Sequence, residues 1–371
     1  MSEDFLPIKG VDHVEFYVGN AKQAAHFYRT GFGFTPVAYS GLETKNRQTT
    51  SYVVEQGNIR LVLTAAMSPD HAIARHAMLH GDGVGVMALA VPDAASAYAE
   101  ATQRGATGAL PPTQLEDEHG VLRMSAIRAY GDTLIKFVDR SDYHGPFAPG
   151  FAARNGAEAG GNGRVRHKGF GLAAIDHIVG NVELGAMNRW VQFFANTMGF
   201  SQLIHFDDED ISTEYSALMS KVMQNGNGKI KFPINEPAEG KKKSQIQEYL
   251  DYYYGPGVQH LACSTGDILE TVTQLRDSGI EFLRVPQTYY DMLEERIGQI
   301  NEPIERLAEL GILVDRDEEG YLLQIFTKPV QDRPTVFFEI IERHGSRGFG
   351  KGNFKALFES IEREQALRGN L

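Results

Sequence analysis

The chain repeats one pattern of strand and helix, and this repeat restricts the folds that it can adopt. Residues 11–32 read as a strand followed by an amphipathic helix, and residues 175–200 repeat that order in the second half. Residues 81–106 and 255–280 form a second pair of matching units. Internal similarity at matching offsets indicates duplication, so each half supplies strand, helix and further strands at least twice. We therefore expect an α+β fold in which helices pack on one face of a curved mixed sheet.

The length of the chain predicts two domains, because 371 residues exceed a usual single domain. Residues 155–163 are mostly glycine and alanine, a composition typical of a linker. We expect an N-terminal repeat domain over residues 1–152, a linker over residues 153–170 and a C-terminal domain over residues 171–371.

A carboxylate inside an apolar strand gives the first functional signal. Residues 336–341 read Val-Phe-Phe-Glu-Ile-Ile, and an unpaired ionised Glu339 there would cost several kcal/mol unless it met a cation. His177 and His260 each lie in a short β-type run bounded by glycine. Two imidazoles and one carboxylate leave three coordination positions open, which suits ferrous iron that binds an organic chelate and dioxygen. The alternative is that each residue alone is a hydrogen-bonded core side chain.

The repeat tests this hypothesis when the three candidate ligands are carried back to the first half. His13 matches the first histidine, but Val86 falls at the place of the second, and Lys136 falls at the place of the glutamate. A histidine, a valine and a lysine cannot hold a divalent cation. We therefore expect one metal site, in the C-terminal domain, and a degenerate, non-catalytic N-terminal domain.

Charge and composition exclude several classes of partner. The formal net charge of −12 disfavours nucleic acid, which requires a basic face. No run of about 18 apolar residues predicts a membrane span, and the N-terminus lacks the pattern of a secretory signal. The single cysteine, Cys263, excludes an internal disulfide and fits a reducing compartment. We expect a cytoplasmic protein with a small-molecule partner.

Five segments carry a resemblance that extends over nearly the whole chain. Residues 233–237, 243–247, 311–317, 323–329 and 348–354 resemble signatures of the 4-hydroxyphenylpyruvate dioxygenase family, in the vicinal oxygen chelate superfamily. The resemblance implies a glyoxalase-like fold with a pair of βαβββ modules in each of two similar domains. It also implies that a C-terminal helix closes over the pocket.

The resemblance further implies a set of site residues. The family's Fe²⁺ ligands fall on the three residues chosen above, His177, His260 and Glu339. The remaining positions form the polar side of the pocket (Ser216, Asn235, Gln245, Gln259 and Gln324) and the substrate-binding walls (Pro233, Phe326, Phe337 and Phe354).

The implied activity is conversion of 4-hydroxyphenylpyruvate and O2 to homogentisate and CO2 in tyrosine and phenylalanine catabolism, by a homo-oligomer (dimer or tetramer). The substrate carries its own 2-oxo acid, so no second oxo acid is required. One alternative is 4-hydroxymandelate synthase, which uses the same substrate; a full phenylalanine at position 354 favours homogentisate. The other alternative is a non-catalytic binding protein of the same fold, against which the three intact ligands argue.

Overall fold

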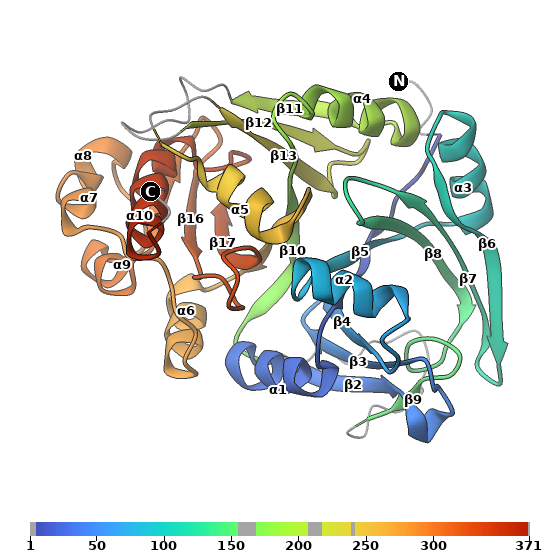
Figure 1. Ribbon diagram of the computed structural model, residues 1–371. Helices are drawn as coiled ribbons and strands as arrows, with labels where there is room; N and C mark the ends of the chain where they lie inside the picture. The colour runs from blue at the N-terminus through green and yellow to red at the C-terminus, as the bar shows by residue number, and fades with distance from the viewer. Residues whose placement is uncertain (1–4, 155–167, 207–216, 239–241, 370–371) are drawn as a thin grey trace.

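Two curled mixed sheets, one from each half of the chain, form the framework of the protein (Figure 1). The computed structural model describes residues 5–154, 168–206, 217–238 and 242–369. The first sheet has the strand order β6-β7-β8-β5-β1-β4-β3-β2-β9, and the second has the order β11-β12-β13-β10-β14-β17-β16-β15.

The elements of the two halves follow one another in matching order. The first half contains β1 (Gly10–Tyr17), α1 (Ala21–Phe32), β2 (Thr35–Ser40), η1 (Leu42–Thr44), β3 (Thr49–Gln56), β4 (Ile59–Ala66), α2 (Ala72–His80), β5 (Gly83–Ala90), α3 (Ala94–Gln103), β6 (Gly108–Asp117), β7 (Gly120–Arg128), β8 (Leu134–Tyr143) and β9 (Ala152–Ala153). The second half contains β10 (Leu172–Asn181), α4 (Met187–Met198), β11 (Ser201–Phe206), β12 (Ala217–Gln224), β13 (Lys231–Ala238), α5 (Gln245–Tyr253), β14 (Gly257–Thr265), α6 (Ile268–Asp277), α7 (Gln287–Asp291), α8 (Leu293–Ile297), α9 (Ile304–Leu310), β15 (Leu313–Arg316), β16 (Tyr321–Phe326), β17 (Phe337–His344), η2 (Lys351–Asn353) and α10 (Phe354–Leu367).

The strand pairing confirms the predicted duplication. In the first sheet β1 runs parallel to β4 and antiparallel to β5, and β5 runs parallel to β8. In the second sheet β10, β13, β14 and β17 repeat these pairings in the same order. Each half is therefore a pair of βαβββ modules, and the last module carries the short helices α7, α8 and α9 between its helix α6 and its strand β15.

Helix ends explain why the repeat was visible in the sequence. The side chain of Asn20 caps the start of α1 by accepting a hydrogen bond from the backbone of Gln23. Both α1 and α4 end at a glycine with positive φ, Gly33 at 75° and Gly199 at 69°. Only glycine adopts this left-handed conformation without strain, so the same Gly-Phe pair stops the first helix of each half.

Strand β17 divides its side chains between two environments. Phe338 is fully buried and packs on aromatic rings of the first half, with ring centroids 4.8 Å from Phe32 and 6.4 Å from Phe16. Side chains alternate along a strand, so Glu339 points to the opposite face. One strand therefore contributes to the core shared by the two halves and to the concave face of the second sheet.

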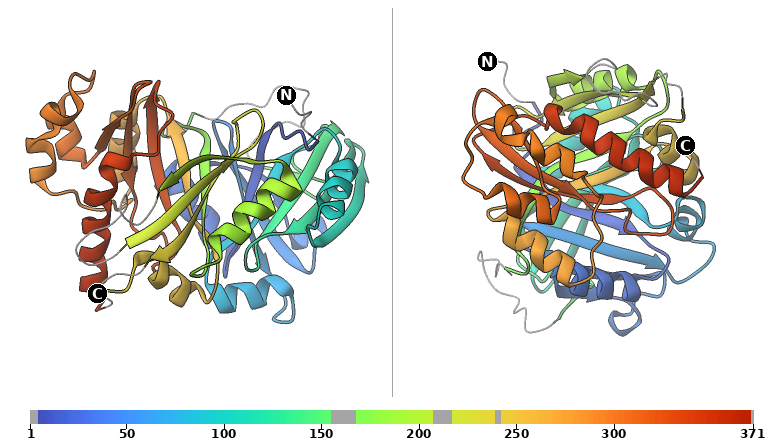
Figure 2. Two further views of the ribbon diagram at one scale, coloured as in Figure 1. Left: turned by 90° about the horizontal axis from the view of Figure 1, so that it is seen from above. Right: turned by 90° about the vertical axis from the view of Figure 1, so that its left-hand side faces the viewer.

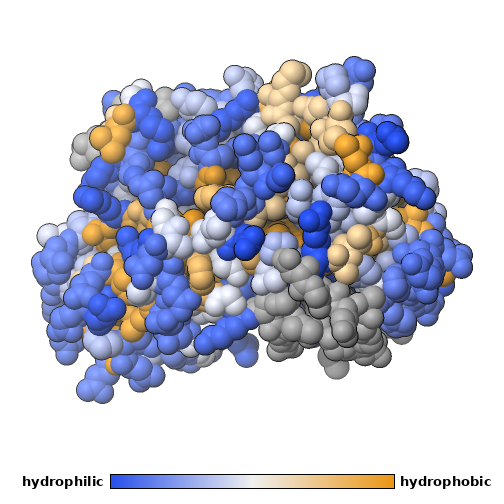
Figure 3. All heavy atoms as spheres, turned by 90° about the horizontal axis from the view of Figure 1, so that it is seen from below, coloured by the Kyte–Doolittle hydropathy of each residue, from blue (hydrophilic) through white to orange (hydrophobic). Residues whose placement is uncertain are grey.

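The terminal helix α10 and the outer surface complete the molecule. Figure 2 shows α10, in red, lying across the second half of the chain, where it packs with α5. Hydrophilic side chains cover most of the face drawn in Figure 3, and hydrophobic ones occur there in small groups. Across the described part of the chain, no helix is both long and apolar enough to cross a membrane.

Candidate metal centre

The three candidate ligands come from three neighbouring strands of the second sheet. His177 lies on β10, His260 on β14 and Glu339 on β17. Ala262 of β14 pairs with His177 on one side and with Glu339 on the other. Paired residues share a face of the sheet, and His260 lies two residues before Ala262, so all three ligand side chains project from the same face.

Their donor atoms are close enough to share one cation. The Nε2 atom of His177 lies 3.2 Å from Oε2 of Glu339, and the Nε2 atom of His260 lies 3.3 Å from the same oxygen. Metal bonds of about 2.1 Å place adjacent ligand atoms roughly 3 Å apart, so these separations fit one ion bound by all three residues. All three side chains are buried.

The electrostatics of the site favour the anionic carboxylate. Burial opposes ionisation of Glu339, but the facing imidazoles of His177 and His260 outweigh it and lower the pKa of Glu339 to about 2. The carboxylate is therefore charged at neutral pH and supplies the anionic ligand that a divalent cation requires.

Each histidine is oriented by the residue that precedes it. The Nδ1 atom of His177 lies 2.8 Å from Oδ1 of Asp176, and the Nδ1 atom of His260 lies 3.0 Å from Oε1 of Gln259. If Nδ1 is the donor in each contact, Nε2 is left with a lone pair that faces Glu339. The ring of Phe337 stacks on His260 with centroids 4.7 Å apart, which restricts its rotation.

A pocket opens in front of the three ligands, and most of the residues expected from the sequence line it. The expected lining residues are Pro233, Asn235, Gln245, Gln259, Phe326, Phe337 and Phe354, together with His177, His260 and Glu339. They come from β10, β13, β14, β16, β17, α5 and α10, so the pocket lies between the concave face of the sheet and the terminal helix.

Two expected polar residues stand apart from this group. Gln324 is on β16, on the face that carries Glu339, but the backbone of Gly350 lies against its amide and it is not among the lining residues. Its Nε2 atom is buried with no hydrogen-bond partner in the described ranges. Ser216 lies outside the described residues.

Sequence reasoning missed several lining residues. Ser220 pairs with Asn235 across β12 and β13 and lines the pocket. Phe349 also lines it, with its ring centroid 5.0 Å from that of His177. In the sequence, residues 348–354 were recognised only as one of the segments that resemble the family, and no role was assigned to Phe349. The strand alternation that selects Asn235 could have pointed to Ser220, but Phe349 has no local signal because a loop sets its position.

The corresponding place in the first half contains an internal cation. The same strand pairing joins His13 to Ala88 and Ala88 to Lys136, as the repeat predicted. The Nζ atom of Lys136 lies 3.4 Å from Oε2 of Glu15, and the other carboxylate oxygen, Oε1, accepts a hydrogen bond from the hydroxyl of Thr64. An ammonium group therefore occupies the position where the second half presents a carboxylate.

A second cluster of possible ligands lies on the other face of β17. The Nε2 atom of His344 is 3.2 Å from Oε1 of Glu302 and 3.1 Å from Oε1 of Glu342. The other oxygen of Glu342 accepts a hydrogen bond from the backbone of Ile268 at the start of α6. None of these three residues lines the pocket, so we interpret the cluster as polar contacts that attach the loop after α8 to β17.

Comparison with known sequences agrees with the fold of each half. Residues 3–153 match the family described as hydroxyphenylpyruvate dioxygenase, N-terminal. Residues 174–325 match the glyoxalase, bleomycin resistance protein and dioxygenase superfamily. The fold and the site together thus define a metalloenzyme of this superfamily, with paired βαβββ modules and a buried cluster of two histidines and a glutamate that faces a pocket.

Full-length relatives narrow the class. The chain is 47% identical over 370 residues to 4-hydroxyphenylpyruvate dioxygenase of Dictyostelium discoideum, with 98% of this chain and 100% of that protein covered. It is also 47% identical to the Caenorhabditis elegans enzyme of that name, with 97% and 93% covered. The chain belongs to the 4-hydroxyphenylpyruvate dioxygenase family.

A solved structure shows the same fold over the whole chain. A triple mutant of 4-hydroxymandelate synthase from Streptomyces coelicolor superposes with a TM-score of 0.87 at 33% sequence identity, covering 97% of this chain and 100% of that one. This synthase is related to the present protein, but its sequence is more distant than those of the two dioxygenases.

Proposed function

We propose that this protein is a 4-hydroxyphenylpyruvate dioxygenase, which converts 4-hydroxyphenylpyruvate and O2 to homogentisate and CO2 in tyrosine catabolism. The observation that carries the proposal is the full-length identity of 46–47% to dioxygenases of that name, combined with three buried donor atoms that face one pocket.

We further propose that the metal is Fe²⁺, held by His177, His260 and Glu339. Two imidazoles and one carboxylate suit ferrous iron and leave room for a chelating substrate and dioxygen. When bound, iron supplies the redox chemistry that oxygen activation requires. The protein supplies the charge balance, because a single carboxylate leaves a net positive centre that attracts the anionic 2-oxo acid.

The pocket residues then orient the substrate. Phe326, Phe337 and Phe354 provide apolar walls for an aromatic ring. Asn235 and Gln245 present amide groups that can hydrogen-bond to the phenol, and Gln259 contributes by fixing the ring of His260. We assign the remaining polar roles to Gln324 and Ser216 by resemblance to the family. Pro233 belongs to the wall beside Asn235.

The proposal includes the organisation of the whole protein. We propose domain boundaries at residues 1–152 and 171–371 with a linker over residues 153–170. A degenerate first domain would act as a scaffold, because its lysine excludes a divalent cation. We also propose that the protein is a homo-oligomer, dimer or tetramer, and that it is cytoplasmic. The one cysteine, Cys263, is free and buried, which fits a reducing compartment.

One aerobic incubation tests the proposed reaction. The iron-loaded protein is mixed with 4-hydroxyphenylpyruvate, and oxygen uptake, CO2 release and the aromatic products are measured. Homogentisate, CO2 and consumed O2 are expected in equal amounts. Mainly 4-hydroxymandelate would identify the sister synthase, and binding of the substrate without oxygen uptake would identify a non-catalytic binding protein.

A further inference from the structure

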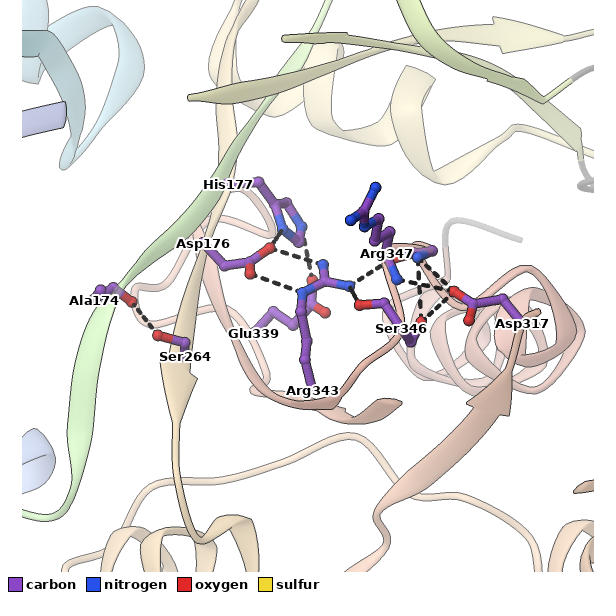
Figure 4. A network of polar contacts seen from close by, with 10 residues as sticks. Ala174, Asp176, His177, Ser264, Asp317, Glu339, Arg343, Ser346 and Arg347 are labelled. Carbon is purple, nitrogen blue, oxygen red and sulfur yellow. Dashed lines mark hydrogen bonds and ion pairs between the residues drawn. The ribbon is translucent and has the colours of Figure 1, made fainter. Parts of the chain in front are cut away.

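Arg343 connects an iron ligand to the segment that leads into the terminal helix. It lies four residues after Glu339 on β17 and projects from the same face of the sheet. Its Nε and Nη2 atoms each donate a hydrogen bond of 2.8 Å to one oxygen of Asp176, so the pair is bidentate. Oδ1 of Asp176 is also the atom that contacts Nδ1 of His177 (Figure 4).

A β-bulge explains why Asp176 can reach both partners. The pairing of β10 with β14 shifts by one residue between Ile175 and His177, which leaves Asp176 as the extra residue. An extra residue bends the strand and re-aims its side chain. The carboxylate therefore lies beside the imidazole of His177 instead of pointing to the opposite face of the sheet.

The other arm of Arg343 holds the loop after β17. Its Nη1 atom donates hydrogen bonds to the carbonyl oxygens of Gly348, at 2.7 Å, and Ser346, at 3.3 Å. From the opposite side, Oδ2 of Asp317 accepts hydrogen bonds from the backbone N–H groups of Arg347 and Gly348. The loop of residues 346–348 is thus held from both sides (Figure 4).

The next residue of the chain returns to the metal site. Phe349 packs edge-on against the ring of His177, and the guanidinium carbon of Arg343 lies 5.6 Å from the centre of the Phe349 ring. The chain then passes through η2 into α10, whose first residue, Phe354, lines the pocket. Arg343 therefore contacts both the residue that orients His177 and the loop that places Phe349.

We propose that Arg343 is a positioning residue that fixes the orientation of His177 through Asp176 and couples this orientation to the loop preceding α10. The role rests on the proposed function, in which His177 is an iron ligand. A guanidinium group makes these contacts at fixed angles, whereas the ammonium group of lysine is a point charge that cannot reproduce the two-pronged contact.

The first half of the chain contains the same connections without the metal ligands. Arg140 donates two hydrogen bonds to Asp12, of 2.7 Å and 3.0 Å, and Asp12 contacts Nδ1 of His13 at 2.6 Å. Arg140 also donates to the carbonyl oxygen of Phe147, whose ring lies 5.2 Å from His13. The network therefore stabilises the fold wherever it occurs, and only its copy in the second half can also act on a metal ligand.

This duplication provides a matched control. Arg343→Lys and Arg140→Lys remove the same bidentate contact from equivalent places. The thermal midpoint of each variant measures the effect on folding. The visible absorption and dissociation constant of Co²⁺, bound in place of iron, report on the ligand geometry without turnover. kcat and KM with 4-hydroxyphenylpyruvate are measured on the iron-loaded proteins.

Arg343→Lys should change the Co²⁺ spectrum, and it should weaken metal binding or lower kcat by about 10- to 100-fold, the range typical of residues that orient metal ligands. Arg140→Lys should leave the spectrum and kcat unchanged while its thermal midpoint falls by a similar amount. Equal losses of stability with an unchanged Co²⁺ spectrum and kcat in both variants would overturn the proposal.

A second variant tests the coupling if Arg343→Lys does not fold. Asp317→Asn weakens the support of the loop and leaves Asp176 untouched. It should change the Co²⁺ spectrum less than Arg343→Lys does, and it should lower kcat at least about threefold. An unchanged spectrum together with an unchanged kcat would overturn the coupling. If the wild-type protein does not turn over 4-hydroxyphenylpyruvate, the proposed function fails, but the Co²⁺ comparison still tests the positioning role.

Discussion

At the scale of single residues, the side chains at two equivalent positions differ in charge and therefore in what each half can bind. Glu339 presents a carboxylate to two imidazoles, whereas Lys136 places an ammonium group beside Glu15. Both arrangements neutralise a carboxylate that is partly or fully buried, because a lone charge away from water is costly. In the first half the neutralising cation is the ammonium group of Lys136. In the second half no lysine stands at the equivalent position, so a metal ion can take its place beside Glu339.

The replacement of a metal by lysine predicts a coupled effect on stability. Lys136→Met should lower the free energy of unfolding by about 2–3 kcal/mol, because Glu15 loses its cation while remaining largely buried. The double variant Lys136→Met/Glu15→Gln should recover most of this loss, and both variants should keep dioxygenase activity. Urea unfolding of the wild-type protein, the single variants Lys136→Met and Glu15→Gln, and the double variant measures the coupling between the two residues. Additive effects would show that Lys136 does not neutralise Glu15.

A second residue-scale prediction concerns Phe354, which lines the pocket and packs edge-on against Phe206 with centroids 5.1 Å apart. An aromatic contact is worth about 0.5–1.5 kcal/mol, so Phe354→Ile should shift the product ratio from homogentisate toward 4-hydroxymandelate by roughly two- to tenfold. Oxygen uptake should persist, because the metal ligands are untouched. A stable, active variant that makes only homogentisate would contradict a steering role, and joint loss of stability and activity would indicate a core residue.

At the scale of elements, helix α10 closes the pocket through contacts at its two ends. Its start is tied to the sheet by the loop that Arg343 and Asp317 hold. Its end is tied to α5 by Arg368, whose Nη2 atom lies 2.8 Å from Oε2 of the buried Glu248. Closure therefore depends on contacts that lie outside the pocket itself.

A single substitution can remove the contact that ties the C-terminal end of α10 to α5. Arg368→Ala should raise KM for 4-hydroxyphenylpyruvate about threefold to tenfold. Loss of the contact with Glu248 destabilises the closed position of α10 by roughly 1 kcal/mol, and substrate binding weakens by that factor. kcat should change by less than about twofold, since the metal ligands and the aromatic walls remain in place. Arg363→Ala, on the exposed side of the same helix, is the matched control, and equal KM values in the two variants would rule out a closing role for Arg368.

At the scale of the whole molecule, a buried histidine of the first half contacts a helix of the second half. His76 of α2 packs edge-on against Tyr17, and its Nε2 atom lies 3.4 Å from the hydroxyl of Tyr253 on α5. Burial, together with the nearby His80, lowers the pKa of His76 to about 4. The folded protein therefore keeps this imidazole neutral over a pH range in which an unfolded chain would protonate it.

The sign of this shift predicts acid sensitivity. Below about pH 6.5 the unfolded chain takes up a proton that the folded protein refuses until about pH 4, so stability falls as the pH drops through that window. At pH 5 the loss from His76 should be on the order of 2 kcal/mol. His76→Gln should therefore show a smaller decrease in thermal midpoint between pH 7 and pH 5 than the wild-type protein. An equal decrease in the two proteins would exclude His76 as a source of acid lability.

The sequence predicted the duplicated fold because its signals are local. Strand patterns, amphipathic helices and the Gly-Phe pairs that begin at Gly33 and Gly199 each lie within a short stretch of chain, and the strand pairing confirmed their order. His177, His260 and Glu339 were grouped from their chemistry, because a carboxylate in an apolar strand needs a cation, and the repeat excluded the first half through Val86 and Lys136. The register of β10, β14 and β17 then brings the three side chains to one face of the sheet.

Contacts set by loops and by helix packing escaped prediction. Phe349 reaches His177 only because Asp317 and Arg343 hold the loop before it. Gln324 carries the expected residue type on the expected face, yet the backbone of Gly350 lies against it. Neither contact leaves a periodic pattern in the sequence, because each joins segments that are distant along the chain.

Metal content per chain is the most direct test of a single iron centre in the second half. Equilibrium dialysis with Fe²⁺ under anaerobic conditions, at fixed protein concentration, should give about one bound ion for the wild-type protein and for His13→Ala. Glu339→Ala should bind far less than one, because it loses the only anionic ligand while circular dichroism shows an intact fold. Full iron occupancy in Glu339→Ala, or loss of iron from a folded His13→Ala, would contradict the assignment of the centre to His177, His260 and Glu339.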